Sequence, residues 1–74
     1  MEKFIELFLE QFDDEVTIEV NQNTRFREIE GWTSLVALMV ITMIDEEYGI
    51  TITGDDMRST STIGELYNLV ASRQ

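Results

Sequence analysis

Apolar residues repeat at helical spacing near the N-terminus, and acidic residues occupy a second face of the same segment. The apolar positions, at i, i+3, i+4 and i+7, are Ile5, Phe8, Leu9 and Phe12. The acidic positions are Glu2, Glu6 and Glu10. This pattern predicts an amphipathic helix from about residue 2 to residue 12. The acidic triplet 13–15 should end the helix as a solvated turn, because no ligand set with calcium-loop spacing follows it.

The next segment alternates between apolar and polar residues. Val16, Ile18 and Val20 have polar neighbours, a pattern that is typical of a strand. A single short strand without a partner is unstable, so we predict a long loop over residues 13–33 instead. Its expected anchors to the core are Val16, Ile18 and Phe26. A loop of this length is uncommon in a small domain unless it is functional or packed.

A stretch without charged residues, from Trp32 to Ile44, predicts a helix over about 34–48. Thr33 is a good N-terminal capping residue, and Gly49 is suited to end the helix. At about 100° per residue, the face that should turn toward the core carries Ala37, Val40, Ile41, Ile44 and Tyr48. A different face carries Leu35, Met39, Thr42 and Glu46.

Leu35, Val36 and Met39 should leave an apolar strip on the outer side of this helix. A helix that is apolar on nearly every side is normally buried, but a domain of 74 residues can cover only one side of it. The strip therefore predicts a contact with a partner protein. In the alternative, the N-terminal helix or the long loop folds over the strip, and Val36 is a peripheral core residue.

Two capping patterns predict shorter helices nearer the C-terminus. Thr53 precedes a pair of acids and should cap a short helical turn over 53–57. Thr62 and Glu65 form a capping box at the start of a last helix. The apolar stripe of that helix is Ile63, Leu66, Tyr67 and Val70. We therefore predict an all-α fold, a small three-to-four-helix bundle with a long loop between its first two main helices.

Composition narrows the classes of function. The chain has 74 residues and a net charge of −10, from 15 acidic and five basic side chains, and we expect one domain over residues 1–74. This charge excludes a nucleic-acid-binding surface and disfavours an anionic membrane. It suits protein partners with basic patches, although it would also simply keep a small domain soluble. The uncharged run is shorter than the roughly 20 residues that span a bilayer, and the N-terminus lacks the form of a secretory signal, so we expect a cytoplasmic protein. We also expect it to be a monomer.

Ser34 lies at the start of the predicted helix, where backbone N–H groups and the helix dipole favour a negative charge. An ordinary capping residue would occupy the same position. The sequence contains no His and no Cys, and its one lysine is Lys3. A serine nucleophile needs such a partner within hydrogen-bond reach, so we expect no enzyme activity and no metal site. We interpret Ser34 as an attachment point.

The stretch 26–35, FREIEGWTSL, resembles the signature of acyl carrier proteins, in which an Asp-Ser-Leu triplet bears 4′-phosphopantetheine on the serine. Two later stretches, 44–52 and 63–67, are similar to the acidic end of the family's second helix and to the start of its last helix. The resemblance covers most of the chain after about Asn21. It implies a carrier of acyl groups, held as thioesters on phosphopantetheine that is attached covalently to Ser34.

The resemblance also implies the surfaces and partners of such a carrier. The residues implied to line an acyl pocket, all ordinary core residues when no chain is bound, are Phe26, Val40, Ile44, Ile52, Met57, Leu66 and Leu69. The residues implied to contact partners are Leu35, Val36, Met39, Thr42, Glu46, Asp55 and Asp56. The implied partners are a phosphopantetheinyl transferase and the enzymes that load and process the acyl group.

Several positions depart from the family pattern. Thr33 stands where an acid usually precedes the serine, and Glu30 stands where a leucine usually precedes the glycine. Val36 and Met39 stand where fatty-acid carriers commonly have acids. Partner enzymes of the family contact those acids with Arg and Lys, so their loss favours a specialised fatty-acid or polyketide-type pathway. The alternatives are a peptidyl or aminoacyl carrier, and an unmodified helical interaction domain of carrier shape.

Overall fold

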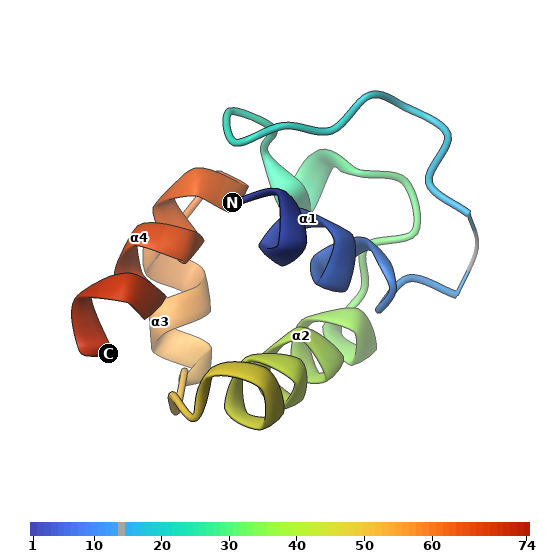
Figure 1. Ribbon diagram of the computed structural model, residues 1–74. Helices are drawn as coiled ribbons and strands as arrows, with labels where there is room; N and C mark the ends of the chain where they lie inside the picture. Colours follow the sequence, from blue (N-terminus) through green and yellow to red (C-terminus); the bar gives the residue numbers. More distant parts are fainter. Residues whose placement is uncertain (14) are drawn as a thin grey trace.

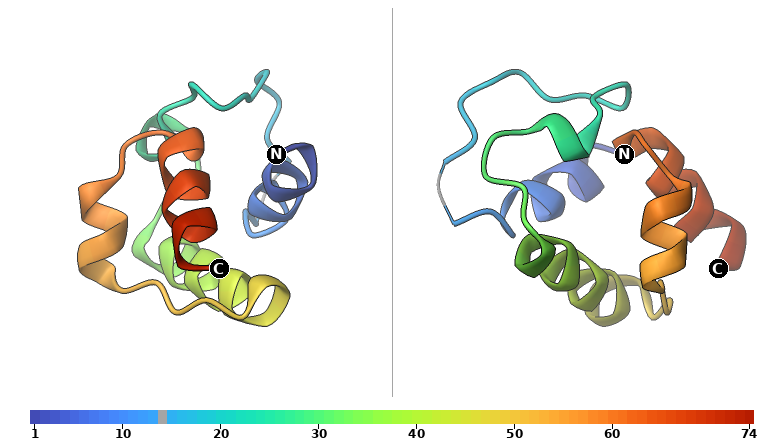
Figure 2. Two further views of the ribbon diagram at one scale, coloured as in Figure 1. Left: turned by 60° about the vertical axis from the view of Figure 1, so that its left-hand side comes forward. Right: turned by 180° about the vertical axis from the view of Figure 1, so that it is seen from behind.

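The computed structural model describes residues 1–13 and 15–74, which form a small all-α bundle (Figure 1). Its helices are α1 (Glu2–Leu9), the 3-10 turn η1 (Phe26–Glu28), α2 (Ser34–Tyr48), α3 (Gly54–Ser59) and α4 (Ile63–Arg73). α2 runs along one edge of the bundle, and the long segment between α1 and α2 loops over the opposite side (Figures 1 and 2). The predicted helical bundle with a long loop is confirmed.

Local capping chemistry sets the ends of the helices that follow the loop. The Thr33 hydroxyl accepts a hydrogen bond from the Val36 N–H at 3.1 Å and begins α2. Gly49 ends α2 with a left-handed φ of 68°, which glycine adopts at little cost because it has no Cβ. Thr53 and Thr62 begin α3 and α4 with complete capping boxes. The predicted bounds of α2 and these caps are confirmed.

α1 is shorter than its sequence pattern predicts, because it ends at Leu9 rather than near Phe12. The Phe12 N–H donates to the Leu9 carbonyl at 3.2 Å, a bond over only three residues that tightens the chain into a turn. The Gln11 side-chain amide donates to the Leu7 carbonyl at 2.9 Å, where the next backbone N–H of a continuing helix would bind. The predicted acidic turn 13–15 includes residue 14, which lies outside the described residues.

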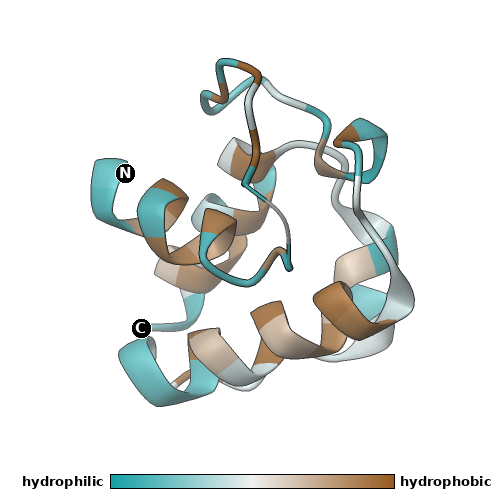
Figure 3. Cartoon of the chain, turned by 90° about the vertical axis from the view of Figure 1, so that its right-hand side faces the viewer, coloured by the Kyte–Doolittle hydropathy of each residue, from teal (hydrophilic) through white to brown (hydrophobic). Residues whose placement is uncertain are grey.

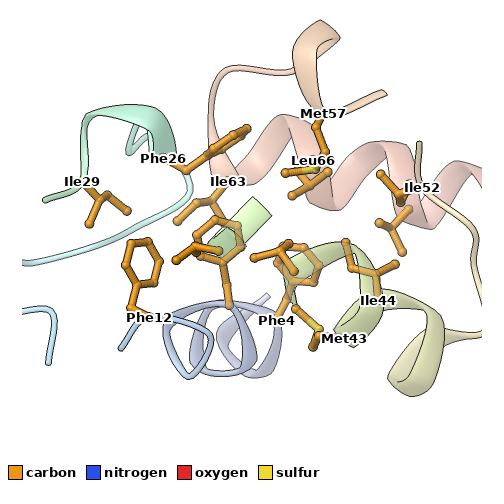
Figure 4. Packing of buried hydrophobic residues seen from close by; sticks show 14 residues of the cluster. Phe4, Phe12, Phe26, Ile29, Met43, Ile44, Ile52, Met57, Ile63 and Leu66 are labelled. Carbon is orange, nitrogen blue, oxygen red and sulfur yellow. The ribbon is translucent and has the colours of Figure 1, made fainter. Parts of the chain in front are cut away.

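The core is one continuous cluster of apolar side chains from the four α-helices and the long loop (Figure 4). Phe4, Phe8 and Phe26 are fully buried aromatic members. The Phe8 ring stacks on Trp32 with centroids 6.0 Å apart, which ties α1 to the segment before α2. Phe4 lies outside the predicted apolar stripe of α1, and its ring meets Tyr67 of α4 edge-on at 5.3 Å. The aromatic residues therefore hold α1 between the loop and α4.

The inward face of α2 differs from the predicted one. Its buried side chains are Val36, Val40, Met43 and Ile44. Ala37, Ile41 and Tyr48 from the predicted stripe are only partly buried. Because α2 is apolar on nearly every side, its pattern carries little information about direction, and packing against the other helices decides which face turns inward. Like the other helices in the described ranges, α2 lacks the length and apolar content that a membrane crossing requires.

The long loop is attached to the start of α4 by backbone hydrogen bonds. The Phe26 N–H donates to the Ser61 carbonyl at 3.2 Å, and the Gly64 N–H donates to the Gln22 carbonyl at 2.8 Å. A Cβ at Gly64 would lie 2.9 Å from the Gln22 oxygen, so this close approach requires glycine. Phe26 is confirmed as an anchor of the loop, whereas Ile18 is 55% exposed, so its prediction as an anchor is wrong.

Candidate functional site

Ser34 is the first residue of α2, and its side chain is exposed. The preceding Thr33 supplies the side-chain cap, because its hydroxyl accepts from the Val36 N–H. The Ser34 hydroxyl takes part in none of the hydrogen bonds found among residues 1–13 and 15–74. The first N–H groups of α2 have no partner within the helix, and the helix dipole is positive at this end. An anionic group attached to Ser34 Oγ would therefore be stabilised.

A groove with a volume of about 670 Å³ lies beside Ser34, between α2 and the residues of η1 and α3. We call it the serine groove, and its lining residues are Arg27, Trp32, Thr33, Ser34, Ala37, Leu38, Ile41, Gly54, Met57 and Arg58. Most of its walls are apolar, and the two charged side chains that line it are Arg27 and Arg58. A flexible group attached to Ser34 has a partly apolar surface within reach.

The two arginines of the serine groove are held differently. Arg27 donates from Nη1 to the Thr60 carbonyl at 2.7 Å and from Nη2 to the Met57 carbonyl, at the C-terminal end of α3. Arg58 pairs with Asp55 one turn earlier on α3, where both side chains are exposed. Arg27 is thus fixed by neutral backbone groups, whereas Arg58 belongs to a surface ion pair.

A second groove, with a volume of about 380 Å³, lies on the side of α2 that faces α1. We call it the acidic groove, and its lining residues are Leu7, Glu10, Gln11, Leu38, Met39, Thr42, Met43, Glu46 and Glu47. Its charged side chains are all glutamates. Leu38 is 58% exposed and lines both grooves. Figure 3 shows the apolar length of α2 giving way to polar residues at its C-terminal end.

The residues predicted to line an acyl pocket lie mainly inside the core. The buried ones are Phe26, Val40, Ile44, Ile52, Met57 and Leu66. Leu69 is partly buried and packs against the same cluster. Met57 also lines the serine groove, so the predicted set reaches the surface beside Ser34 through this side chain.

The predicted partner surface is only partly brought together. Met39, Thr42 and Glu46 line the acidic groove, and Leu35 is 59% exposed on the same helix. Val36 is 3% exposed, so the prediction that it belongs to an outer apolar strip is wrong. Its side chain is on the inward face of α2, one turn before Val40 and with it in the core cluster. The alternative, in which Val36 is a core residue, is the one that the structure supports.

The two acids predicted as partner contacts on α3 each form an ion pair with an arginine of this chain. Asp55 pairs with Arg58. Asp56 accepts from the two Nη atoms of Arg73 at 2.7 and 2.9 Å, and it also accepts the Thr53 N–H that closes the capping box. The Arg73 guanidinium holds the pKa of Asp56 well below its usual range. In the part of the chain that the structure describes, no group of three or more His, Cys, Asp or Glu side chains is placed to hold a metal ion.

Several groove residues were not identified from the sequence, among them Leu38 and both arginines of the serine groove. Leu38 lies next to Met39 in an all-apolar stretch, and its exposure could have been suspected because one helix cannot bury every side. Arg27 and Arg58 are distant in sequence and come together because η1 docks on the end of α3. No local pattern signals that contact.

The chain matches a known protein family. The family profile described as phosphopantetheine attachment site matches residues 2–70, which contain Ser34 and both grooves. No curated protein matches the chain significantly. The exposed hydroxyl at the N-terminus of α2 suits a phosphodiester, and the groove beside it suits a flexible arm. Because the match covers most of the chain, the protein belongs to the phosphopantetheine-attachment family and is a carrier protein that binds 4′-phosphopantetheine covalently.

Proposed function

We propose that Ser34 is the attachment residue and that the protein carries an acyl intermediate in a specialised fatty-acid or polyketide-type pathway. The observation that carries this proposal is the position of Ser34, which is exposed at the first residue of α2 and borders the serine groove. Thr33 supplies the cap, so the Ser34 hydroxyl is not needed to begin the helix. A phosphodiester on Ser34 Oγ would meet the free N–H groups and the positive end of α2.

When bound, phosphopantetheine supplies the thiol that holds cargo as a thioester, and the chain itself has no cysteine. The protein's own residues position and shelter the attached group. Thr33 fixes the first turn of α2 and with it the direction of Ser34, while Trp32 and Met57 offer apolar walls. Carrier domains of this family are not catalytic themselves. We extend this to the present chain, whose only lysine, Lys3, is outside the serine groove and which has no His.

Carrier domains in general interact with a modifying transferase and with acyl-processing enzymes. For this chain we propose that these enzymes contact the outer side of α2, where Leu35 and Leu38 are exposed and Thr42 and Glu46 are adjacent. The missing acids around the serine support a specialised pathway rather than housekeeping fatty-acid synthesis. We further propose that residues 1–74 are one carrier domain and that it acts as a cytoplasmic monomer.

Intact mass tests the attachment. Apo protein incubated with coenzyme A and a broad-specificity phosphopantetheinyl transferase should gain one phosphopantetheine group. In that step Ser34 Oγ bonds to the phosphorus proximal to the pantetheine, the pyrophosphate P–O bond breaks, and adenosine 3′,5′-bisphosphate leaves. The hydroxyl proton passes to a base on the transferase. Ser34→Ala should abolish the gain, whereas Ser59→Ala at the end of α3 should retain it.

Two results would contradict the proposal. A full gain of mass in Ser34→Ala would place the attachment on another residue. No gain in the wild type with several transferases would instead favour the unmodified interaction domain, for which the exposed Leu35 and Leu38 would be docking residues.

A further inference from the structure

The serine groove has a charge opposite to that of the whole protein. The chain carries 15 acidic and five basic side chains, yet the charged residues that line this groove are Arg27 and Arg58. Within residues 1–13 and 15–74, no carboxylate is among the lining residues. An anionic ligand is therefore attracted here and repelled by the acid-rich surface elsewhere.

Arg27 presents a fixed guanidinium that has no carboxylate within salt-bridge distance among the described residues. Its two Nη atoms donate to the carbonyls of Thr60 and Met57, and its central carbon lies 4.9 Å from the centroid of the Phe26 ring. A guanidinium has about five N–H donors in a rigid fork, so these two bonds leave donors for a ligand. Because the group is already positioned, it would lose little side-chain entropy on binding an anion.

Arg58 is a second cation, and its present partner is exchangeable. The pair with Asp55 spans one turn of α3, and the two side chains are 72% and 88% exposed. Exposed pairs of this kind contribute little to stability because water and salt screen them. An anion in the serine groove can therefore take the place of Asp55 at small cost.

The remaining walls of the groove are mostly apolar side chains from α2, α3 and the segment before α2. A ligand that satisfies both features has an apolar body and an anionic end. We propose that the serine groove selects acyl cargo whose far end carries a carboxylate, with Arg27 as a fixed donor and Arg58 as the cation that leaves Asp55. This inference rests on the proposed attachment at Ser34, because cargo enters the groove from there.

The phosphodiester at Ser34 is also an oxyanion, so it could bind the same arginines as a cargo carboxylate. That phosphate is bonded to Ser34 Oγ, where the first N–H groups of α2 already stabilise it. Arg27, by contrast, is docked on the C-terminal end of α3, and Arg58 lies on α3 itself. Cargo that continues from the arm into the groove has both guanidiniums along its path. The experiment below separates the two sources.

The test compares cargoes of equal chain length. A broad-specificity transferase loads apo protein from hexanoyl-coenzyme A, from adipoyl-coenzyme A, which adds a terminal carboxylate, and from coenzyme A alone. Intact mass verifies each loading, and thermal unfolding at low salt gives each midpoint. We expect the adipoyl form to melt several degrees above the hexanoyl form, and we expect added salt to shrink the difference.

Arginine variants locate the effect. Arg58→Gln should remove most of the difference between the two cargoes. Arg25→Gln is the matched control, because Arg25 is also an exposed arginine paired with a carboxylate, that of Glu28, but does not line the serine groove. It should keep the full difference.

Equal midpoints for the two cargoes in the wild type would overturn the proposal, and so would an Arg25→Gln variant that loses as much as Arg58→Gln. If Arg58→Gln lowers the midpoint of the bare-arm form as much as that of the adipoyl form, the guanidinium serves the phosphodiester and the cargo assignment is wrong. A protein that gains no mass from any donor would overturn attachment at Ser34 and this inference with it. Mass and melting therefore distinguish the two failures.

Discussion

The two grooves beside α2 share Leu38 but differ in charge, in volume and in their relation to Ser34. The charged side chains that line the serine groove, which has a volume of about 670 Å³, are arginines, and those that line the acidic groove, of about 380 Å³, are glutamates. The arginines of the serine groove come from η1 and α3, whereas α2 itself supplies Glu46 and Glu47 to the acidic groove. One apolar helix therefore borders two surfaces of opposite charge, because its neighbours supply the arginines of one groove while its own C-terminal end supplies two of the three glutamates of the other.

This separation bears on how a carrier avoids competition between cargo and partner. A basic partner surface is attracted toward the acidic groove over distances of about a Debye length, roughly 8–10 Å in physiological salt. The anionic cargo that we propose would be repelled from that side and attracted to the other. Variants on the two sides should therefore have separable effects, which makes the comparison testable.

The largest expected difference in stability is between Val36, in the core, and Leu38, the exposed side chain that lines both grooves. We call Leu38 the exposed ridge between the grooves. Val36→Asp places a carboxylate in the core, where it has no partner, and should lower the free energy of unfolding by about 3 kcal/mol or more. Leu38→Asp changes an exposed side chain and should stay within about 0.5 kcal/mol of the wild type. Urea unfolding followed by circular dichroism measures both. Similar losses in the two variants would mean that Leu38 is packed in solution and that the grooves are not divided by an exposed ridge.

Capping chemistry explains why the helices after the loop could be predicted from the sequence. Thr33, Thr53 and Thr62 each accept an N–H from the residue three positions on, and Gly49 adopts the left-handed conformation that ends α2. These interactions are complete within a few consecutive residues, so the sequence alone contains them. The position of Ser34 at the start of α2 follows directly from the Thr33 cap.

The grooves lack such a local signal. Because α2 is apolar on nearly every side, periodicity alone does not distinguish Val36 from Ala37 as the inward residue. Arg27 and Arg58 meet through hydrogen bonds between η1 and the end of α3, which are contacts between distant parts of the chain. The inward face of α2 and the two arginines of the serine groove therefore depend on tertiary packing, which the local sequence does not specify.

Reversing one charge in the acidic groove tests that side by itself. Glu46→Lys should slow modification by a transferase about two- to fivefold at low salt, the equivalent of the ~0.4–1 kcal/mol that an exposed charge pair contributes. The mass added should be unchanged, and added salt should reduce the difference in rate. Glu19→Lys makes the same change in net charge at an exposed loop residue that lines neither groove. An equal slowing in Glu19→Lys would assign the effect to net charge rather than to the acidic groove.

The smallest effect concerns Arg73, an arginine outside both grooves. Its two Nη atoms donate to the Asp56 carboxylate at 2.7 and 2.9 Å. These bonds, and after them the hydrogen bond from the Thr53 N–H, hold the pKa of Asp56 well below its usual range. Arg73 is thus committed to a carboxylate within the fold, in contrast to Arg27 of the serine groove.

The consequence for pH dependence follows from the direction of that shift. Asp56 binds its proton more weakly in the folded chain than in the unfolded chain, so its stabilising contribution is complete above the ordinary carboxyl pKa and is lost as pH falls below it. Wild type should therefore lose much of its advantage in thermal midpoint over Asp56→Asn as pH falls from about 5 to about 2, by an amount that solvent screening keeps small. If the midpoint of Asp56→Asn falls with pH as steeply as that of the wild type, Arg73 is no more committed to the fold than the arginines of the serine groove.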